Sequence, residues 1–483
     1  MDLSYWKIPN NLDRLLKEEN RKIVTRFPPE PSGYLHIGHV KAIFINYVIA
    51  KKYEGDMILR FDNTNPVTES EEFENIIRDD ITKLDVVPDK TTYSSDYFET
   101  LIKLAEDLIL RHKAYVDTSP RDVVKKERWA SIESHNRDNT VEKNTNLWKN
   151  MKDGVLQNAT LRIKIDMKHP NANCRDPTIF RFIDKPHHRT GNKFKVYPTY
   201  DFTCPILDSL EGVTHAFRSV EYSDREEQYN FILDVLNLRK PKVLCYGKVK
   251  IENIVLSKRK IKALIEKGEI SSWEDPRLYT LRGLLNAGFH LSALKQFVAT
   301  LGFSSKTPPV MSANKLCAIN RKIVDKIATR STCMDTNSLP FKIIGKISDN
   351  KEVYKWHRNP ELGVRLLQFS GNVLIEKVDL SNNEEITLMN WSNAIVNEKC
   401  MILNLQGDFK STSKKLLWIA SENPVHVFID TYSSGSKQTK QYYGESHLLR
   451  LNPGNYIQFL KMNYYMCYKI DLNTRAIFFV EIN

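Results

Sequence analysis

The chain has 483 residues, which is too long for a single hydrophobic core, so we expect three or four structural units. Hydrophobic residues make up 41% and charged residues 27%, as is ordinary for a soluble globular protein. No apolar run approaches the roughly 18 residues that a membrane span needs, which argues against a membrane protein or a membrane partner.

The net charge is +12, which suits a polyanionic partner but equally suits exposed lysines that keep a protein soluble. The N-terminus has no basic stretch followed by an apolar core, so we expect a cytoplasmic protein. Seven cysteines are scattered without a C-x-x-C pair. This spacing indicates neither a disulfide framework nor a zinc ribbon, and we predict no protein-bound metal.

The predicted elements begin with an amphipathic helix within residues 1–22, which we interpret as structural. A β-prone run follows at 23–27, and the prolines and glycine of 28–33 end it. Apolar residues then recur at helical spacing over 40–48, and a second apolar strand is predicted at 57–61. This order predicts one βαβ unit of a parallel sheet.

Two histidines mark the expected start of the helix in this unit. His36 and His39 are three residues apart, so both rings can face one side of the first turn, where the helix N-terminus favours a phosphate. The G-x-G-x-x-G signature of dinucleotide-binding proteins is absent, which argues against a dehydrogenase. The simpler alternative is that both histidines are capping or solvated residues.

Two segments of different character follow. Residues 68–86 predict a helix whose acidic residues form a solvated face. Residues 96–196 are helices rich in charge followed by strands, a pattern that indicates a domain inserted between two halves of the sheet.

Residues 195–222 return to apolar runs, and here we expect a substrate to be recognised. Tyr200 lies at a strand-to-helix boundary, although such a residue can also be a core or capping residue. Arg218 stands among apolar residues and needs a partner, for which a carboxylate is the obvious choice. The alternative is an internal ion pair with Glu211 or Glu221.

The remaining chain is helical and then strand-rich. A basic run at 257–260 precedes an amphipathic helix, where such runs are usually solvated. Helices continue to about residue 330, and the tail from 331 alternates apolar and polar residues between Gly and Asn turns. This alternation predicts two antiparallel β-barrels.

Four of these stretches together resemble a known family. PPEPSGYLHIGH and VLSKRK resemble the HIGH and KMSKS signatures of class I aminoacyl-tRNA synthetases. With RFDNTNP and YPTYDF, they resemble glutamyl-tRNA synthetases of the archaeal and eukaryotic type, whose architecture is that of glutaminyl-tRNA synthetase. The similarity covers nearly the whole chain.

The resemblance implies an α/β Rossmann-like catalytic domain with an inserted acceptor-binding domain and a helical connector, followed by the two β-barrels. The expected divisions are 1–95 and 197–258 for the catalytic halves, 96–196 for the insertion, 259–330 for the connector and 331–483 for the anticodon-binding barrels. Basic residues of the insertion implied to serve tRNA phosphates are Lys125, Lys126, Arg128, Arg137, Lys143 and Lys149.

The resemblance further implies a glutamate–tRNA ligase that uses ATP with Mg²⁺ to make glutamyl-adenylate and then charges tRNA(Glu). The implied catalytic residues are His36, His39 and Lys258. Those that would line ATP are Glu30, Pro31, Ser32, His36, Ile37, Gly38, His39, Val40, Lys41, Ala42, Lys248, Val249, Leu256, Ser257 and Lys258. Those that would hold L-glutamate are Arg26, Asp62, Tyr200, Arg218 and Ser219.

Two positions bear on specificity within this resemblance. Glutaminyl enzymes carry a small uncharged residue where Arg218 stands and typically an asparagine where Ser32 stands, so glutamate is favoured. The sequence departs from the family pattern at Asn63, usually a second aspartate, and at Lys248-Val249, usually Arg-Leu. The alternatives are a glutaminyl or non-discriminating enzyme on the same fold, a catalytically silent tRNA-binding protein, and a small-molecule nucleotidyltransferase.

Overall fold

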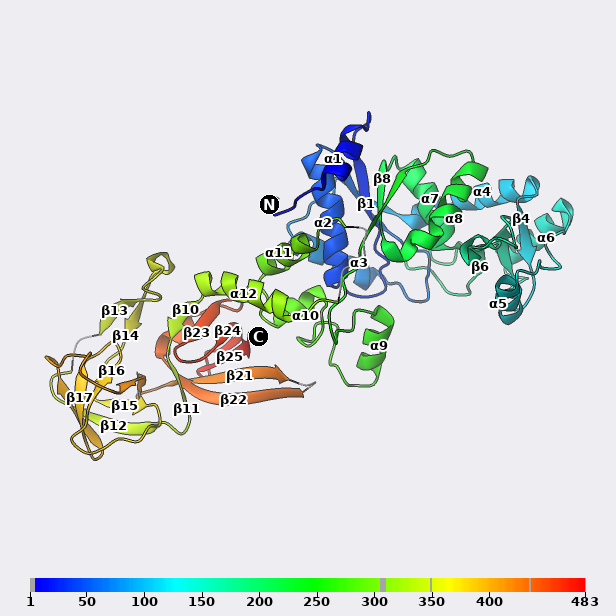
Figure 1. Ribbon diagram of the computed structural model, residues 1–483. Coiled ribbons are helices and arrows are strands. Elements are labelled where there is room, and N and C mark those ends of the chain that lie inside the picture. The colour runs from blue at the N-terminus through cyan, green and yellow to red at the C-terminus, as the bar shows by residue number, and fades with distance from the viewer. Residues whose placement is uncertain (1–4, 305–309, 348–349, 434–435, 483) are drawn as a thin grey trace. The chain divides into compact units, whose positions relative to one another are not determined.

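The structure is a computed structural model that describes residues 5–304, 310–347, 350–433 and 436–482 (Figure 1). Met1–Ser4 of the predicted lead-in helix lie outside the described residues. The helix found in that segment is α1 (Asn10–Lys17), which is shorter than predicted.

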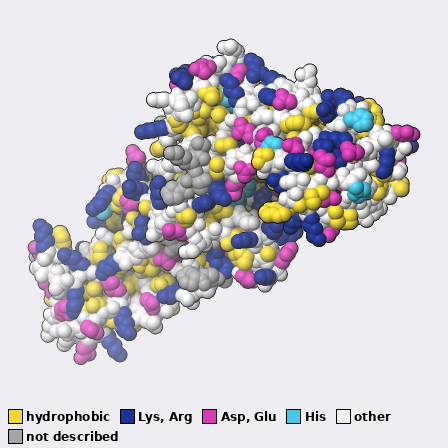
Figure 2. Space-filling view, turned by 45° about the vertical axis from the view of Figure 1, so that its right-hand side comes forward, with side chains coloured by type: hydrophobic (Ala, Val, Ile, Leu, Met, Phe, Trp, Pro, Cys, Tyr) yellow, Lys and Arg dark blue, Asp and Glu magenta, His cyan; other side chains and the backbone are white. Residues whose placement is uncertain are grey.

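The chain divides into two compact units. One comprises Met1–Trp273 with Lys295–Met311, and the other comprises Glu274–Leu294 with Ser312–Asn483. The five ranges predicted from the sequence, two of which are halves of one catalytic domain, are a finer division and remain a prediction. In the part of the chain that the structure describes, no helix is both long and apolar enough to cross a membrane. Figure 2 shows Lys and Arg side chains intermixed with Asp and Glu side chains on the face in view.

A parallel sheet forms the centre of the first unit. Its order is β1 (Val24–Phe27), β2 (Asp56–Phe61) and β3 (Lys90–Tyr93), and both pairings are parallel. A second parallel pair, β8 (His215–Ser219) and β9 (Lys242–Tyr246), lies beside β1 (Figure 1). The two groups are joined by hydrogen bonds from Val24 N to Thr214 Oγ1 (2.8 Å) and from Thr214 N to Val24 O (2.9 Å).

Helix α2 (Ile37–Lys52) connects β1 to β2 and confirms the predicted βαβ unit. Its sequence is apolar around most of its circumference, and the helix is accordingly buried against β1, β2 and β8. The proline-rich turn leads from β1 directly to the first turn of α2, so this turn faces the carboxyl ends of the strands.

Helix α3 (Glu71–Lys83) starts where Phe73 N–H donates to the Ser70 hydroxyl (3.3 Å). The predicted solvated acidic face is wrong for two of its residues, because Glu74 and Asp80 are buried. Glu74 receives a hydrogen bond from His188 at 2.6 Å. No local pattern indicates this partner, because His188 lies more than a hundred residues further along the chain.

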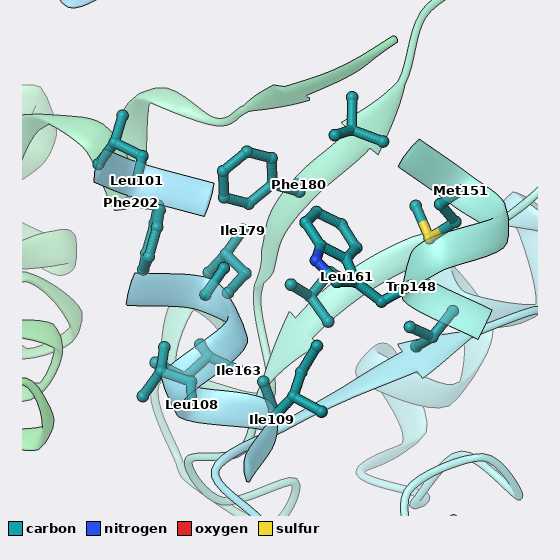
Figure 3. Close-up of a cluster of buried hydrophobic side chains, with 14 of the residues drawn as sticks. Leu101, Leu108, Ile109, Trp148, Met151, Leu161, Ile163, Ile179, Phe180 and Phe202 are labelled. Carbon is teal, nitrogen blue, oxygen red and sulfur yellow. The ribbon is translucent and has the colours of Figure 1, made fainter. Parts of the chain in front are cut away.

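Residues of the predicted insertion form a four-stranded antiparallel sheet in the order β4-β5-β6-β7. Trp148, Phe180 and their neighbours fill the core between this sheet and its helices (Figure 3). The same core includes Phe202, so the insertion and α7 share one apolar cluster. The elements are α4 (Phe98–Leu110), β4 (Ala114–Asp117), α5 (Arg121–Ala130), α6 (Val141–Asp153), β5 (Thr160–Ile163), β6 (Thr178–Phe182), β7 (Val196–Pro198) and α7 (Tyr200–Leu210).

The first unit is completed by α8 (Glu226–Val235), which packs on α7, and by α9 (Lys258–Glu266). Short 3₁₀ turns occur at η1 (Ser94–Tyr97), η2 (Ala172–Cys174) and η3 (Val220–Arg225). Helix α11 (Leu291–Leu301) contributes residues to both units.

The second unit contains α10 (Leu281–Asn286), α12 (Asn314–Ile327) and two seven-stranded sheets. Helix α12 packs on the first sheet through Val324, beside Met466, Val480 and Ile482. The order of this sheet is β10-β23-β24-β25-β21-β22-β11. Its strands are β10 (Thr329–Ser331), β11 (Cys333–Asp335), β21 (Val425–Ser433), β22 (Ser436–Gly444), β23 (Tyr456–Phe459), β24 (Tyr464–Asp471) and β25 (Ala476–Glu481).

The other sheet has the order β19-β16-β17-β18-β12-β15-β20, and a separate hairpin pairs β13 with β14. Its core contains Val373, Ile386 and Trp418. The strands are β12 (Leu339–Ile344), β13 (Lys351–Tyr354), β14 (Val364–Leu367), β15 (Asn372–Ile375), β16 (Glu385–Leu388), β17 (Asn393–Asn397), β18 (Cys400–Asn404), β19 (Lys415–Leu416) and β20 (Trp418–Ala420).

Both sheets are mixed, which corrects the purely antiparallel pairing that we predicted. Parallel pairs are β10 with β23, β21 with β25, β12 with β18 and β16 with β19. Alternation of apolar and polar residues identifies a strand with one buried face, but it is the same for both strand directions. Strand direction is set by connections between distant segments, which the alternation does not record.

Candidate active site

A cavity of about 960 Å³ opens at the carboxyl ends of the strands in the first unit. Its walls include the ends of β1, β8 and β9, the residues after β2, and the first turn of α2. Ligands of open parallel sheets commonly bind at this edge.

Most of the site residues predicted from the sequence line this cavity. They are Arg26, Glu30, His36, Gly38, His39, Lys41, Ala42, Asp62, Tyr200, Arg218, Ser219, Lys248, Val249, Leu256, Ser257 and Lys258. Pro31, Ser32, Ile37 and Val40 are not in its lining. Ile37 and Val40 are completely buried.

His36 and His39 cap their own helix reciprocally. Gly38 N–H donates to His36 Nδ1 (3.0 Å), and His36 N–H donates to His39 Nδ1 (3.1 Å). Since each Nδ1 accepts a hydrogen bond, each neutral ring carries its proton on Nε2. The capping alternative is therefore correct, and it leaves two Nε2–H donors for a ligand.

Burial keeps these rings neutral. It lowers the pKa of His36 to about 4, and the positive charge of Lys258 acts in the same direction. Burial likewise lowers the pKa of His39 well below its usual value, with His36 and Lys258 contributing. The ring centroids are 3.8 Å apart, so one anionic atom can face both rings.

Lys258 connects the two signatures that lie far apart in the sequence. It is the first residue of α9, and its Nζ donates to Glu30 O (2.8 Å) and to the Ser32 hydroxyl (3.4 Å). Burial lowers the pKa of Lys258 to about 8. The ammonium group therefore lies against the turn that precedes α2.

Arg218 is the penultimate residue of β8 and is only 4% exposed, yet its Nε and Nη1 atoms have no hydrogen-bond partner. Its guanidinium carbon lies 5.1 Å from the ring of Tyr222, 5.2 Å from that of Tyr229 and 6.0 Å from that of Tyr200. Aromatic faces attract a cation, but they do not satisfy its N–H groups.

The internal ion pair considered for Arg218 is wrong. Glu211 binds Arg60 at 2.6 Å, and Glu221 binds Lys248 at 2.6 Å. Both carboxylates are thus engaged elsewhere, and the guanidinium group of Arg218 remains available in the cavity.

Arg26 is engaged differently from what we predicted. Its Nε donates to Asp208 (2.9 Å) and its Nη1 donates to the carbonyl of Phe217 (2.8 Å), while the side chain is 1% exposed. The residue lines the cavity, but most of its hydrogen-bonding capacity serves the protein. A buried arginine needs such a partner, and the sequence did not identify Asp208.

Asp62 follows β2 and is 8% exposed. Its carboxylate accepts a hydrogen bond from the Ser94 hydroxyl (3.4 Å). Burial raises the pKa of Asp62 to about 7, and the negative charge of Glu30 adds to this effect. A bound cation would favour its ionised form.

Sequence reasoning missed several charged residues of the cavity, among them Glu69 and Arg181. Glu69 is 8% exposed and its Oε1 has no partner, while burial and the charge of Asp62 raise its pKa to about 9. Arg181, at the end of β6, also lines the cavity. Glu69 belongs to an acidic run that resembles any solvated helix start, so the sequence contains no local signal for it.

Two further lysines of the cavity have protein partners. Lys41 is 1% exposed and donates to the carbonyl of Gly247 (2.5 Å), and burial lowers its pKa to about 8. Lys248 pairs with Glu221, as described above.

Of the basic residues expected to serve tRNA, Arg137 binds Asp176 (2.7 Å) and Arg128 donates to the carbonyl of Arg175 (3.0 Å).

Outside the cavity, the described part of the chain contains one group of three potential metal-ligating side chains, His169, Cys174 and Glu227. His169 Nδ1 accepts a hydrogen bond from Asn171 N–H (3.1 Å), so Nε2 carries the proton and donates to Glu227 (3.1 Å). Hydrogen bonding accounts for this arrangement.

Comparison with known proteins agrees with these features. The family model for the catalytic domain of class I tRNA synthetases (E and Q) matches residues 22–326, and that for their anti-codon binding domain matches 328–408. A probable cytoplasmic glutamate–tRNA ligase of Encephalitozoon cuniculi is 39% identical over 93% of this chain and 75% of that relative.

Two other similar proteins differ more in length or sequence. The bifunctional glutamate/proline–tRNA ligase of Cricetulus griseus is 40% identical over 93% of this chain but only 32% of its own length. A solved glutamate tRNA ligase from Elizabethkingia meningosepticum has a TM-score of 0.44 and 16% identity, and the match covers 63% of this chain and 70% of that one.

Proposed function

This chain belongs to the class I tRNA synthetases of the glutamate and glutamine family, and from that premise we propose that it is a glutamate–tRNA ligase. ATP would activate L-glutamate to glutamyl-adenylate with release of pyrophosphate. The glutamyl group would then pass to the 3′ end of tRNA(Glu), giving glutamyl-tRNA and AMP.

One observation supports glutamate most strongly: the guanidinium group of Arg218 is buried in the cavity wall, and its Nε and Nη1 atoms have no hydrogen-bond partner. A buried cation without a counter-charge is costly, and a ligand carboxylate would remove that cost while accepting two N–H bonds. The side chain of glutamine has no charge to offer. A site with Arg218 in this state therefore favours glutamate.

Asp62 would bind the α-ammonium group of the amino acid. Burial raises the pKa of its carboxyl group to about 7 in the free site, and a substrate ammonium beside it would stabilise the ionised form. Tyr200 and the Ser219 hydroxyl, which is buried without a partner, would complete the pocket.

The nucleotide would occupy the side of the cavity formed by α2 and the start of α9. The Nε2–H groups of His36 and His39 would donate to phosphate oxygens, and Lys258 would offset the charge that builds on the departing pyrophosphate. Mg²⁺ would arrive with ATP as part of the substrate. The carboxylate of glutamate itself attacks the α-phosphate, so no protein nucleophile is needed.

For tRNA, we propose that the insertion contacts the acceptor stem and that the two mixed sheets of the second unit close into barrels that read the anticodon. The match of residues 328–408 to an anti-codon binding domain supports this assignment. A cytoplasmic location fits the name of the Encephalitozoon cuniculi relative.

The direct test is aminoacylation of total tRNA with labelled glutamate and, separately, labelled glutamine, with and without ATP. Charging with glutamate alone, dependent on ATP, is expected. Charging with glutamine would contradict the role of Arg218 in specificity. Failure with both amino acids, in protein that still binds tRNA, would favour a catalytically silent tRNA-binding protein.

A further inference from the structure

A buried carboxylate lies behind the amino-acid pocket and joins four elements of the first unit. Asp208, in α7, is completely buried and accepts hydrogen bonds from Arg26 Nε (2.9 Å), Arg60 Nη1 (2.7 Å) and the Tyr229 hydroxyl (3.0 Å). These partners come from β1, β2 and α8 respectively. The two arginines hold the pKa of Asp208 down to about 2, against the opposing effect of burial.

The first connection from Asp208 to the pocket runs through the backbone. Arg26, fixed by Asp208 at Nε, donates from Nη1 to the carbonyl of Phe217 (2.8 Å). Phe217 immediately precedes Arg218 at the end of β8. The orientation of Arg26 therefore restrains the peptide from which the Arg218 side chain emerges.

The second connection runs through an aromatic ring. The Tyr229 hydroxyl donates to Asp208 Oδ2, and the ring of the same residue lies 5.2 Å from the guanidinium carbon of Arg218. Asp208 thereby fixes one of the rings that surround Arg218.

The charges around Asp208 are balanced without Arg218. Asp208 and Glu211 offset Arg26 and Arg60, which are their ion-pair partners. Arg218 lies next to this balanced group and donates no hydrogen bond to it from Nε or Nη1. The positive charge of Arg218 is therefore not offset by an ion pair within this group and can interact with a ligand.

We propose that Asp208 is a positioning residue for amino-acid selection: through Arg26 and Tyr229 it fixes Arg218 in the orientation that pairs with a side-chain carboxylate. This inference rests on the proposed glutamate–tRNA ligase activity and adds a residue that does not itself line the cavity. Asp208 sets both the affinity for glutamate and the discrimination against glutamine.

The test compares Asp208→Asn with the matched control Glu211→Gln in the full chain. Both substitutions remove one buried carboxylate from the same charge network, but the ion pair of Glu211 is with Arg60, which has no contact with Phe217 or Tyr229 among the described hydrogen bonds. Tyr229→Phe serves as a milder variant, because it removes only the hydrogen bond to Asp208. Aminoacylation at saturating tRNA measures kcat and KM for glutamate, for glutamine and for ATP.

For Asp208→Asn we expect KM for glutamate to rise about tenfold or more, with KM for ATP within about twofold of wild type and reduced preference over glutamine. Glu211→Gln should leave KM for glutamate within about twofold of wild type, even if its thermal unfolding temperature falls as much as that of Asp208→Asn. Tyr229→Phe should raise KM for glutamate about two- to fivefold.

The possible results distinguish a failure of the positioning role of Asp208 from a failure of the proposed glutamate–tRNA ligase activity. If wild-type protein charges tRNA with glutamate but Asp208→Asn and Glu211→Gln behave alike, the positioning role is wrong. If Asp208→Asn does not fold, an unchanged KM for glutamate in Tyr229→Phe overturns it. If wild-type protein does not charge glutamate at all, the proposed function itself has failed.

Discussion

At the scale of single residues, Arg218 carries the claim about specificity. Arg218→Gln keeps much of the side-chain volume but removes the charge, so a substrate carboxylate loses a charge-assisted pair that contributes roughly 1.5–3 kcal/mol. We expect kcat/KM for glutamate to fall about 10- to 100-fold in aminoacylation assays. Arg225→Gln is the matched control, because Arg225 lines the same cavity but is already paired with Asp201 at 2.8 Å. Equal losses in the two variants would contradict the assignment.

The lowered pKa of Lys258 predicts that kcat/KM for ATP depends on pH. Its pKa is lowered to about 8 in the free protein, so the ammonium form that is needed to hold phosphate charge disappears as the pH rises through that value. We expect kcat/KM for ATP to fall above pH 8, since this parameter reports ionisations of the free enzyme.

A control is needed because Lys41, in the same cavity, also has a pKa of about 8. Lys258→Arg keeps the positive charge to much higher pH. It should be less active overall but should lose the alkaline decline. A decline that persists unchanged in Lys258→Arg would show that another group, such as Lys41, is responsible.

The residue scale also shows where sequence reasoning stopped. The histidines and Lys258 belong to short contiguous motifs, and Arg218 is conspicuous as a charge among apolar residues. The structure brings all of them to one cavity. Glu69 and Asp208 were not found, because an acidic residue looks the same in a sequence whether it is solvated or buried against a distant arginine. Their environment is made by pairings such as that of Asp208 with Arg26, which are 182 residues apart.

At the scale of elements, the first turn of α2 combines a structural and a proposed catalytic role in His36. Asparagine is a good N-cap, whereas alanine is a poor one whose introduction costs about 1 kcal/mol. We expect His36→Asn to keep the stability of the wild type and His36→Ala to lower the free energy of unfolding by about that amount. Denaturant titration measures this difference.

Both His36 variants should lose activity, because neither side chain places an imidazole Nε2–H at the phosphates. Loss of one such donor commonly costs roughly 3 kcal/mol, or about a hundredfold in rate. ATP–pyrophosphate exchange, in the presence of tRNA, measures the adenylation step. Near wild-type exchange in His36→Asn would mean that His36 only caps the helix.

Among the elements, those with strong local patterns were the most predictable. The βαβ unit was predicted because proline, glycine and apolar spacing mark its turn, its helix and its strands within forty residues. The mixed pairing of the second unit was not predicted, because the parallel pair of β10 with β23 joins segments more than a hundred residues apart. Local periodicity carries no information about such partners.

At the scale of the whole molecule, the net charge of +12 predicts that tRNA binding is sensitive to salt. Each phosphate neutralised by a lysine or arginine releases bound counterions. A plot of the logarithm of the binding constant against the logarithm of the salt concentration therefore has a negative slope of roughly 0.7–0.9 per phosphate contact. Binding of glutamate should change much less, since its proposed partners are buried and screened little by salt.

The exposed lysines Lys125 and Lys126 of α5 allow this to be located. Changing both to glutamine should weaken tRNA binding and reduce the salt slope by about 1–2, because two phosphate contacts are lost. The matched control changes Lys17 and Lys240, which are paired with Asp13 (2.8 Å) and Asp234 (2.6 Å), and removes the same total charge. Equal slopes in the two double variants would mean that net charge alone, rather than the basic surface of the insertion, attracts the tRNA.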